Sequence, residues 1–91
     1  MFKCQITIAE TIREVNPEVY QQLLASGELE EITWAYQERL NQECSQAAWE
    51  AGQGDFGALE QTQRMQQAAR QMEELVMQEI LEEVILIYRP E

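Results

Sequence analysis

The sequence predicts an all-α protein. Its apolar residues recur at intervals of three or four from Ile8 onward, which is the spacing of one face of a helix. Residues that end helices are few, and three of the four glycines lie within residues 52–57. We therefore expect a single small domain over residues 1–91, built from two short N-terminal helices and a long antiparallel helical hairpin.

The N-terminal segment has two interpretations. Residues 2–8 alternate apolar and polar side chains, which is typical of a half-buried strand and also of an extended lead-in. The spacing of Ile8, Ile12 and Val15 then predicts a short helix from about residue 9 to residue 15.

A second short helix is predicted to begin at Asn16 and Pro17. Asn can cap the free amides of a helix, and Pro fits the first helical position, where its missing N–H costs nothing. Gly27 would end this helix. Its apolar residues fall on one side and are Val19, Tyr20, Leu23 and Leu24.

The rest of the chain predicts the hairpin. The first of its helices covers residues 28–51, and residues 52–57 form the turn. The second helix would start near Asp55 and continue to about Tyr88, until Pro90 ends it. Its period near 3.6 favours antiparallel packing over a coiled coil. The alternative for residues 84–88 is a strand paired with residues 2–8.

The end of the last predicted helix is apolar on more than one side, so it requires burial on more than one side. We expect a second copy of the chain to cover it, in a homodimer, and the alternative is wrapping by the short N-terminal elements. The expected oligomer interface consists of Met77, Leu81, Ile85 and Tyr88.

Charge and composition exclude several classes of function. The chain has 17 acidic and 6 basic residues, a net charge of -11, so direct binding of nucleic acid is disfavoured. It has no His, which removes the usual general base and zinc ligand. Its 2 Cys are too few for a disulfide framework, and no apolar run approaches the ~20 residues that cross a bilayer. We expect a cytoplasmic protein that is not an enzyme and has no catalytic residue, metal or cofactor.

Two motif matches are coincidental. Residues 52–57 spell G-x-G-x-x-G, but the preceding segment is a predicted helix instead of the strand that a dinucleotide site needs. Asp55, Phe56 and Gly57 spell a kinase triplet in a chain too short for a kinase. Paired glutamates could bind Mg²⁺ or Mn²⁺, but a solvated face explains them better.

Large aromatic residues and glutamates are the candidate partner-binding residues. Trp34 and Trp49 share a stripe that lies away from the predicted core face, about 22 Å apart along the helix. The alternative is that the N-terminal helices cover them. Trp is enriched at binding hot spots, and paired glutamates can steer a basic partner. The full expected set is Trp34, Trp49, Tyr20, Glu30, Glu31, Glu73 and Glu74.

Two stretches carry a family resemblance. In residues 17–29, Tyr20 is followed by a Leu-rich turn, Ser-Gly, one charged residue and Leu. Residues 64–80 contain Arg-Met and a later Glu-Glu-Leu-Val. Over about two thirds of the chain this order resembles the transposon-encoded TnpV family. The resemblance implies a small accessory protein of a mobile element, with no catalytic residues to carry over.

These observations favour a non-catalytic acidic interaction protein of a mobile element or phage. We expect it to bind and inhibit a basic nucleic-acid-handling protein complex, in the manner of an anti-CRISPR or anti-restriction protein that mimics DNA charge. The alternative is a homo-oligomeric structural or assembly protein with no such partner.

Overall fold

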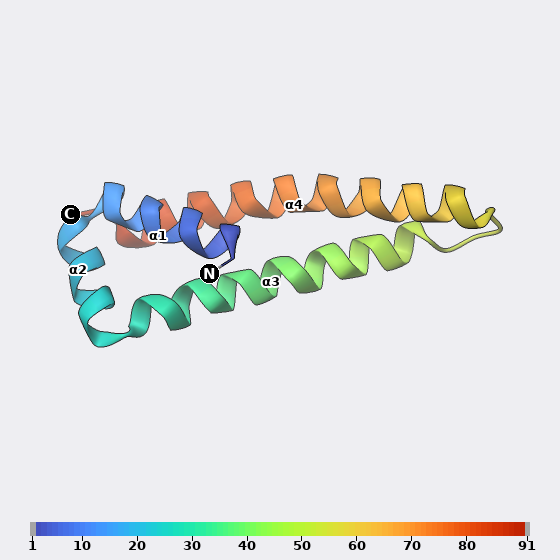
Figure 1. Ribbon diagram of the computed structural model, residues 1–91. Coiled ribbons are helices and arrows are strands. Elements are labelled where there is room, and N and C mark those ends of the chain that lie inside the picture. The colour runs from blue at the N-terminus through green and yellow to red at the C-terminus, as the bar shows by residue number, and fades with distance from the viewer. Residues whose placement is uncertain (1, 91) are drawn as a thin grey trace.

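The computed structural model describes residues 2–90, which form four helices and no strand. In chain order the helices are α1 (Lys3–Val15), α2 (Pro17–Ser26), α3 (Glu28–Ala51) and α4 (Ala58–Tyr88). Figure 1 shows α3 and α4 side by side and running in opposite directions along a molecule of 53 × 22 × 14 Å. The prediction of an all-α protein is confirmed.

The strand interpretation of the N-terminal segment is wrong, because α1 begins at Lys3. Cys4, Ile8 and Ile12 are buried at intervals of four residues, which is the spacing of a helix face. The apparent alternation came from Ile6, which is apolar but 43% exposed. The short helix predicted from residue 9 therefore starts six residues earlier.

The strand alternative for residues 84–88 is also wrong. The α-helix α4 continues to Tyr88, and the Arg89 N–H still donates to the Ile85 carbonyl at 3.1 Å. The start of α4 differs from the prediction as well. It begins at Ala58 instead of near Asp55, because Gly54 adopts a φ of 125° and the turn extends to Gly57.

The core lies in the half of the molecule that contains α1 and α2. There α1 packs against both α3 and α4. The buried apolar residues are Cys4, Ile8, Ile12, Leu29, Leu40, Val76, Ile80 and Val84. We call this half the head, residues 2–43 and 73–90.

The other half consists of α3 and α4 alone with the turn between them, as Figure 1 shows, and we call it the arm, residues 44–72. Of the residues in the arm, only Gly52 is buried. Its Cα lies against the Met65 side chain, and a Cβ built there would meet the sulfur at 2.9 Å. The two helices of the arm therefore meet through small and half-buried residues.

Two short connections, at Asn16 and at Gly27, fix how the helices of the head follow one another. Asn16 Oδ1 accepts from the Val19 N–H at 3.3 Å and caps α2, while Asn16 Nδ2 donates to the Tyr88 carbonyl at 3.1 Å. Gly27, with a φ of 83°, ends α2 and allows α3 to start at the next residue. The N-terminal helices are thus tied to the end of α4.

Candidate functional site

An open groove runs between the start of α1 and the start of α3. We call it the aromatic groove, and its lining residues are Phe2, Gln5, Gly27, Glu30, Glu31 and Trp34. The ring centroids of Phe2 and Trp34 are 5.8 Å apart at 33°, so the two rings pack in a tilted pair. Phe2 remains 55% exposed and Trp34 43% exposed, which leaves half of this aromatic surface free for contact.

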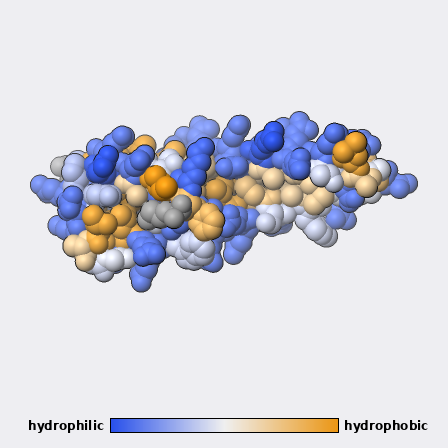
Figure 2. Space-filling view, viewed as in Figure 1, coloured by the Kyte–Doolittle hydropathy of each residue, from blue (hydrophilic) through white to orange (hydrophobic). Residues whose placement is uncertain are grey.

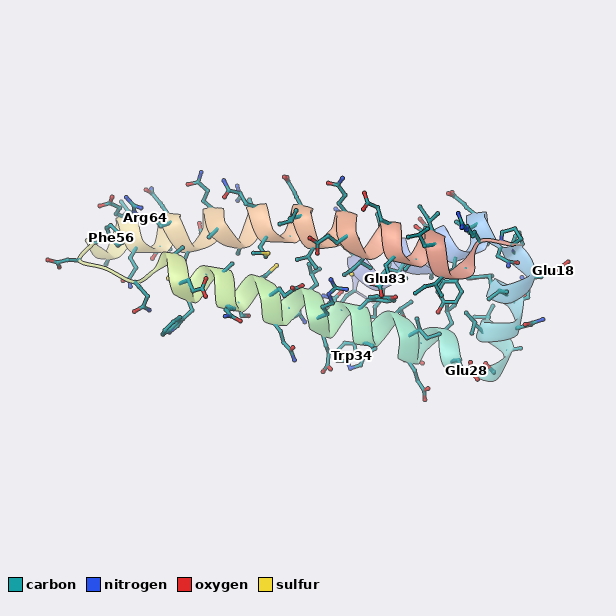
Figure 3. All side chains as sticks on the ribbon, turned by 180° about the vertical axis from the view of Figure 1, so that it is seen from behind. Glu18, Glu28, Trp34, Phe56, Arg64 and Glu83 are labelled. Atoms are coloured by element: carbon teal, nitrogen blue, oxygen red, sulfur yellow. The ribbon has the colours of Figure 1, made fainter. Side chains whose placement is uncertain are left out.

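The helix start at Gly27 sets the α3 side of the groove. Since Glu30, Glu31 and Trp34 follow Gly27 by three, four and seven residues, they lie on one face of α3. Figure 3 shows Trp34 on the side of α3 that points away from α4.

The α1 side of the groove is fixed by Gln5, which is only 4% exposed. Its Oε1 accepts from the Phe2 N–H at 3.1 Å, and its Nε2 donates to Thr33 Oγ1 at 3.4 Å. Gln5 therefore closes the first turn of α1 and links it to α3, which holds the Phe2 backbone beside Trp34.

The groove carries two carboxylates that have no ion-pair partner among the described residues. Glu30 and Glu31 are exposed, and within residues 2–90 neither has a basic side chain within 4.0 Å. Glu30 and Glu31 line the same groove as the Phe2 and Trp34 rings. This combination provides both charge and apolar contact to a cationic ligand.

The other predicted partner-binding residues lie elsewhere. Glu73 and Glu74 lie on α4 beside α1, in a depression that also contains Lys3 and Arg70. Their negative charge is therefore partly offset by neighbouring cations.

Trp49 is on the arm and is 64% exposed. Tyr20 is half-buried and packs against the core. The structure thus brings Trp34 together with Glu30 and Glu31, but it does not bring Trp49 or Tyr20 to the same place.

Nothing in the sequence pattern alone marks Phe2, Gln5 and Gly27 as groove residues. Gln5 at the third position of α1, bonded back to the Phe2 N–H, is half of a capping box, and this signal marks a helix start. The strand-like alternation of residues 2–8 concealed it.

The residues of the expected oligomer interface differ in how far this chain itself buries them. Met77 and Tyr88 are half-buried against this chain's own core, and Leu81 is also half-buried. Ile85 is 45% exposed. The apolar side chains that are most exposed on this part of α4 are instead Leu86 at 63% and Ile87 at 56%.

A charged cluster joins α3 to α4 on the surface. Arg39 on α3 lies 3.4 Å from Glu43, 3.5 Å from Glu79 and 3.1 Å from Glu83. Figure 3 shows Glu83 in the space between the two helices. Because all four side chains are well exposed, each pair contributes only about 0.2–1 kcal/mol. One cation among three carboxylates leaves the cluster net negative.

Charge is divided unequally between the two halves. The head contains 13 acidic and 4 basic residues, a net charge of -9, whereas the arm contains 3 acidic and 2 basic residues, a net charge of -1. Figure 2 shows hydrophobic side chains gathered over the part of the head that faces the viewer, among hydrophilic ones. The head therefore combines strong negative charge with exposed apolar residues.

The cysteines are poorly suited to nucleophilic chemistry. Burial raises the pKa of the Cys4 thiol and of the Cys44 thiol, and the negative charge of Glu73 raises both further. A raised pKa keeps a thiol protonated, and the thiolate is the reactive form. Within residues 2–90, no three Cys, Asp or Glu side chains are placed to share a metal ion.

None of the helices in residues 2–90 combines the length and the apolar character needed to cross a membrane. Compared with protein-family models, curated proteins and solved structures, the chain has no match. The resemblance to the TnpV family therefore stays a prediction.

Proposed function

We propose that this chain is a non-catalytic acidic interaction protein that docks on a basic surface of another protein through its head. The observation that carries the proposal is the joint presence, on one face of α3, of a half-exposed Trp34 beside Phe2 and of two glutamates that make no ion pair within residues 2–90. Charges of one sign raise the rate of encounter with an oppositely charged partner, and aromatic anchors supply affinity once the surfaces meet.

The partner class that fits best is a nucleic-acid-handling protein, because such proteins carry basic surfaces of the required sign. In the specific form of the proposal, the chain belongs to a phage or another mobile element and blocks that surface, as an anti-CRISPR or anti-restriction protein does. The head, with its net charge of -9, would occupy the site that phosphates use.

Charge density limits how far DNA mimicry extends. A duplex as long as this 53 Å molecule carries roughly 31 phosphate charges, at about one per 1.7 Å. The net charge of -11 is about a third of that number. By electrostatic attraction alone, the chain would therefore bind a basic surface more weakly than nucleic acid does. The proposal thus requires apolar anchoring at Trp34 and Phe2 in addition to charge.

The test is affinity capture from a lysate of the source cells, after nuclease treatment, with charge-reversed variants. We expect the wild-type chain to retain a basic protein, and the variant with Glu30→Lys and Glu31→Lys to lose most of it. The matched control carries Glu50→Lys and Asp55→Lys, which is the same change in net charge but on the arm. It should retain the partner.

Three results would count against the proposal. In the first, no partner is captured. In the second, both variants capture the partner as well as the wild type does. In the third, the partner is lost after nuclease treatment, because the contact then runs through nucleic acid.

A second candidate is a homo-oligomeric structural or assembly protein, and the exposure of Ile85, Leu86 and Ile87 favours it. These consecutive side chains point about 100° apart around α4, and Leu86 and Ile87 line one depression that a second copy could cover. This candidate predicts a mass that rises with protein concentration in light scattering and changes little with salt.

A further inference from the structure

We propose that the aromatic groove is a binding site for a single arginine side chain of the partner protein. This inference rests on the proposed function and adds to it the chemical group that the groove recognises. The guanidinium would lie against the Trp34 and Phe2 rings, with Glu30 and Glu31 accepting its N–H groups.

The two rings of the groove are placed to contact a cation. Trp34 lies on α3 and Phe2 is the N-cap residue of α1; their ring centroids are 5.8 Å apart, and each side chain is about half exposed. An aromatic face attracts a cation, and Trp is the strongest of the aromatic residues in this respect. The protein already contains one such contact, since the Arg64 guanidinium lies 4.2 Å from the Phe56 ring centroid at the tip of the arm (Figure 3).

The carboxylates of the groove would accept hydrogen bonds from the same cation. At the tip of the arm, Arg64 has its own carboxylate partner, Glu60, at 3.3 Å. In the aromatic groove the carboxylates and the rings are both present, but no basic side chain of residues 2–90 lies within 4.0 Å of Glu30 or Glu31. Among residues 2–90 the groove therefore has the anionic and aromatic half of such an arrangement, and the proposed arginine of the partner would supply the cationic half.

Arginine fits this arrangement better than lysine or an anion. A guanidinium is planar, weakly hydrated and able to stack on a ring while it donates to two carboxylates, whereas an ammonium is strongly hydrated and compact. Phosphate groups are repelled by Glu30 and Glu31. The groove is about 680 Å³ in volume, so the segment that carries the arginine can also lie along it.

The test uses the full-length ¹⁵N-labelled chain and three capped peptides, Gly-Arg-Gly, Gly-Lys-Gly and Gly-citrulline-Gly. The chain has 2 Trp, so its two indole N–H signals report the groove at Trp34 and a surface outside it at Trp49. At about 0.15 M salt, where exposed charges more than about 8 Å apart are screened, we expect the arginine peptide to shift the Trp34 signal saturably, with a Kd on the order of millimolar. Trp49 should not shift.

Two comparisons separate arginine recognition from general attraction to an acidic protein. The lysine peptide should bind at least about threefold more weakly, and the citrulline peptide should cause no shift. The variant with Glu30→Gln and Glu31→Gln should weaken binding of the arginine peptide by about threefold or more. The variant with Glu73→Gln and Glu74→Gln has the same net charge and should leave the Kd nearly unchanged.

The proposal is overturned if Trp34 and Trp49 shift together, if the lysine peptide binds as well as the arginine peptide, or if both glutamine variants weaken binding equally. It is also overturned if the arginine peptide leaves Trp34 unchanged at millimolar concentrations. None of these results changes the outcome of the capture experiment, because that experiment tests docking on a basic protein without the peptides. Loss of capture with an intact peptide site would overturn the proposed function instead.

Discussion

Individual residues determine where the helices of the head end and how they join. Gly27 is the clearest case, because it adopts a φ of 83° between α2 and α3 and has open space around its Cα. Only the backbone conformation, and no close contact, requires glycine there. Gly57 also has open space, but its φ of -66° suits any residue.

Replacing Gly27 with Ala should therefore destabilise the protein by about 1 kcal/mol, since Ala in the left-handed region is strained. The control is Gly57→Ala, which also replaces an N-cap glycine but at a φ that Ala adopts without strain, so it should cost less than Gly27→Ala. Urea unfolding followed by circular dichroism measures both. Equal losses in the two variants would contradict the conformational explanation.

Four ionisable side chains, one in the core and three half-buried against it, have a raised pKa. Burial raises the pKa of Cys4, Cys44, Tyr36 and Tyr88, and it is the largest cause in each case. When the folded-state pKa of a thiol or phenol lies above its unfolded value, the unfolded state releases protons first as pH rises. The stability that such a group contributes is fully present below its pKa in the unfolded chain. It is lost as the pH rises toward its pKa in the folded chain.

We accordingly expect the melting temperature to fall as the pH rises above the ordinary values of 9.0 for the thiols and 10.0 for the phenols. The variant Tyr36→Phe has one such group fewer and should lose less stability above about pH 10. Thermal denaturation at a series of pH values between about pH 8 and about pH 10.5 provides the measurement. A melting temperature that rises over this range would refute the assignment.

At the scale of the elements, periodicity predicted the helices well where one face alone is apolar. The boundaries of the second and third predicted helices agree with α2 and α3, because Pro17, Gly27 and Gly52 mark them. Prediction failed at residues 2–8, where the exposed Ile6 made a helix look like a strand. Local spacing cannot show which apolar side chain a distant helix will cover, and that information comes only from tertiary packing.

The same reason explains what could be predicted of the candidate site. Glu30, Glu31 and Trp34 were predicted as partner-binding residues because their identities and their place on the helix are visible in the sequence. Phe2 was not, since its proximity to Trp34 depends on how α1 packs against α3. Whether these residues bind a partner stays a prediction.

Within α4, the contribution of a side chain to the free energy of unfolding should increase with its burial. Ile80 is 0% exposed, and Ile80→Ala should cost about 2–5 kcal/mol, because it removes apolar contacts and leaves a cavity. Leu75 on the same helix is 52% exposed, and Leu75→Ala should cost less than about 1 kcal/mol. Chemical denaturation compares the two. A larger loss for Leu75→Ala would mean that a second copy of the chain buries that surface.

At the scale of the whole molecule, the head and the arm differ in both packing and charge. The head contains the buried apolar core and a net charge of -9. In the arm only Gly52 is buried, and the net charge is -1. The surface proposed to contact a partner thus lies on the half that contains the buried core.

This division predicts uneven hydrogen exchange. Amides in the arm should exchange faster than amides around Val76, Ile80 and Val84, because few buried apolar contacts oppose local opening. Hydrogen exchange followed by mass spectrometry or NMR gives the comparison. Equal protection of the arm would show that something covers it in solution, and a concentration series would reveal whether this is another copy of the chain.

We propose that negative charge on the head, together with Trp34, docks the chain on a basic protein surface. The most direct measurement is the affinity between the chain and its captured partner over a range of salt concentrations, with and without nucleic acid. The account predicts that affinity falls steeply as salt rises, that the variant with Glu30→Gln and Glu31→Gln binds more weakly with a shallower salt dependence, and that nucleic acid competes. An affinity that is independent of salt and unchanged in this variant would contradict it.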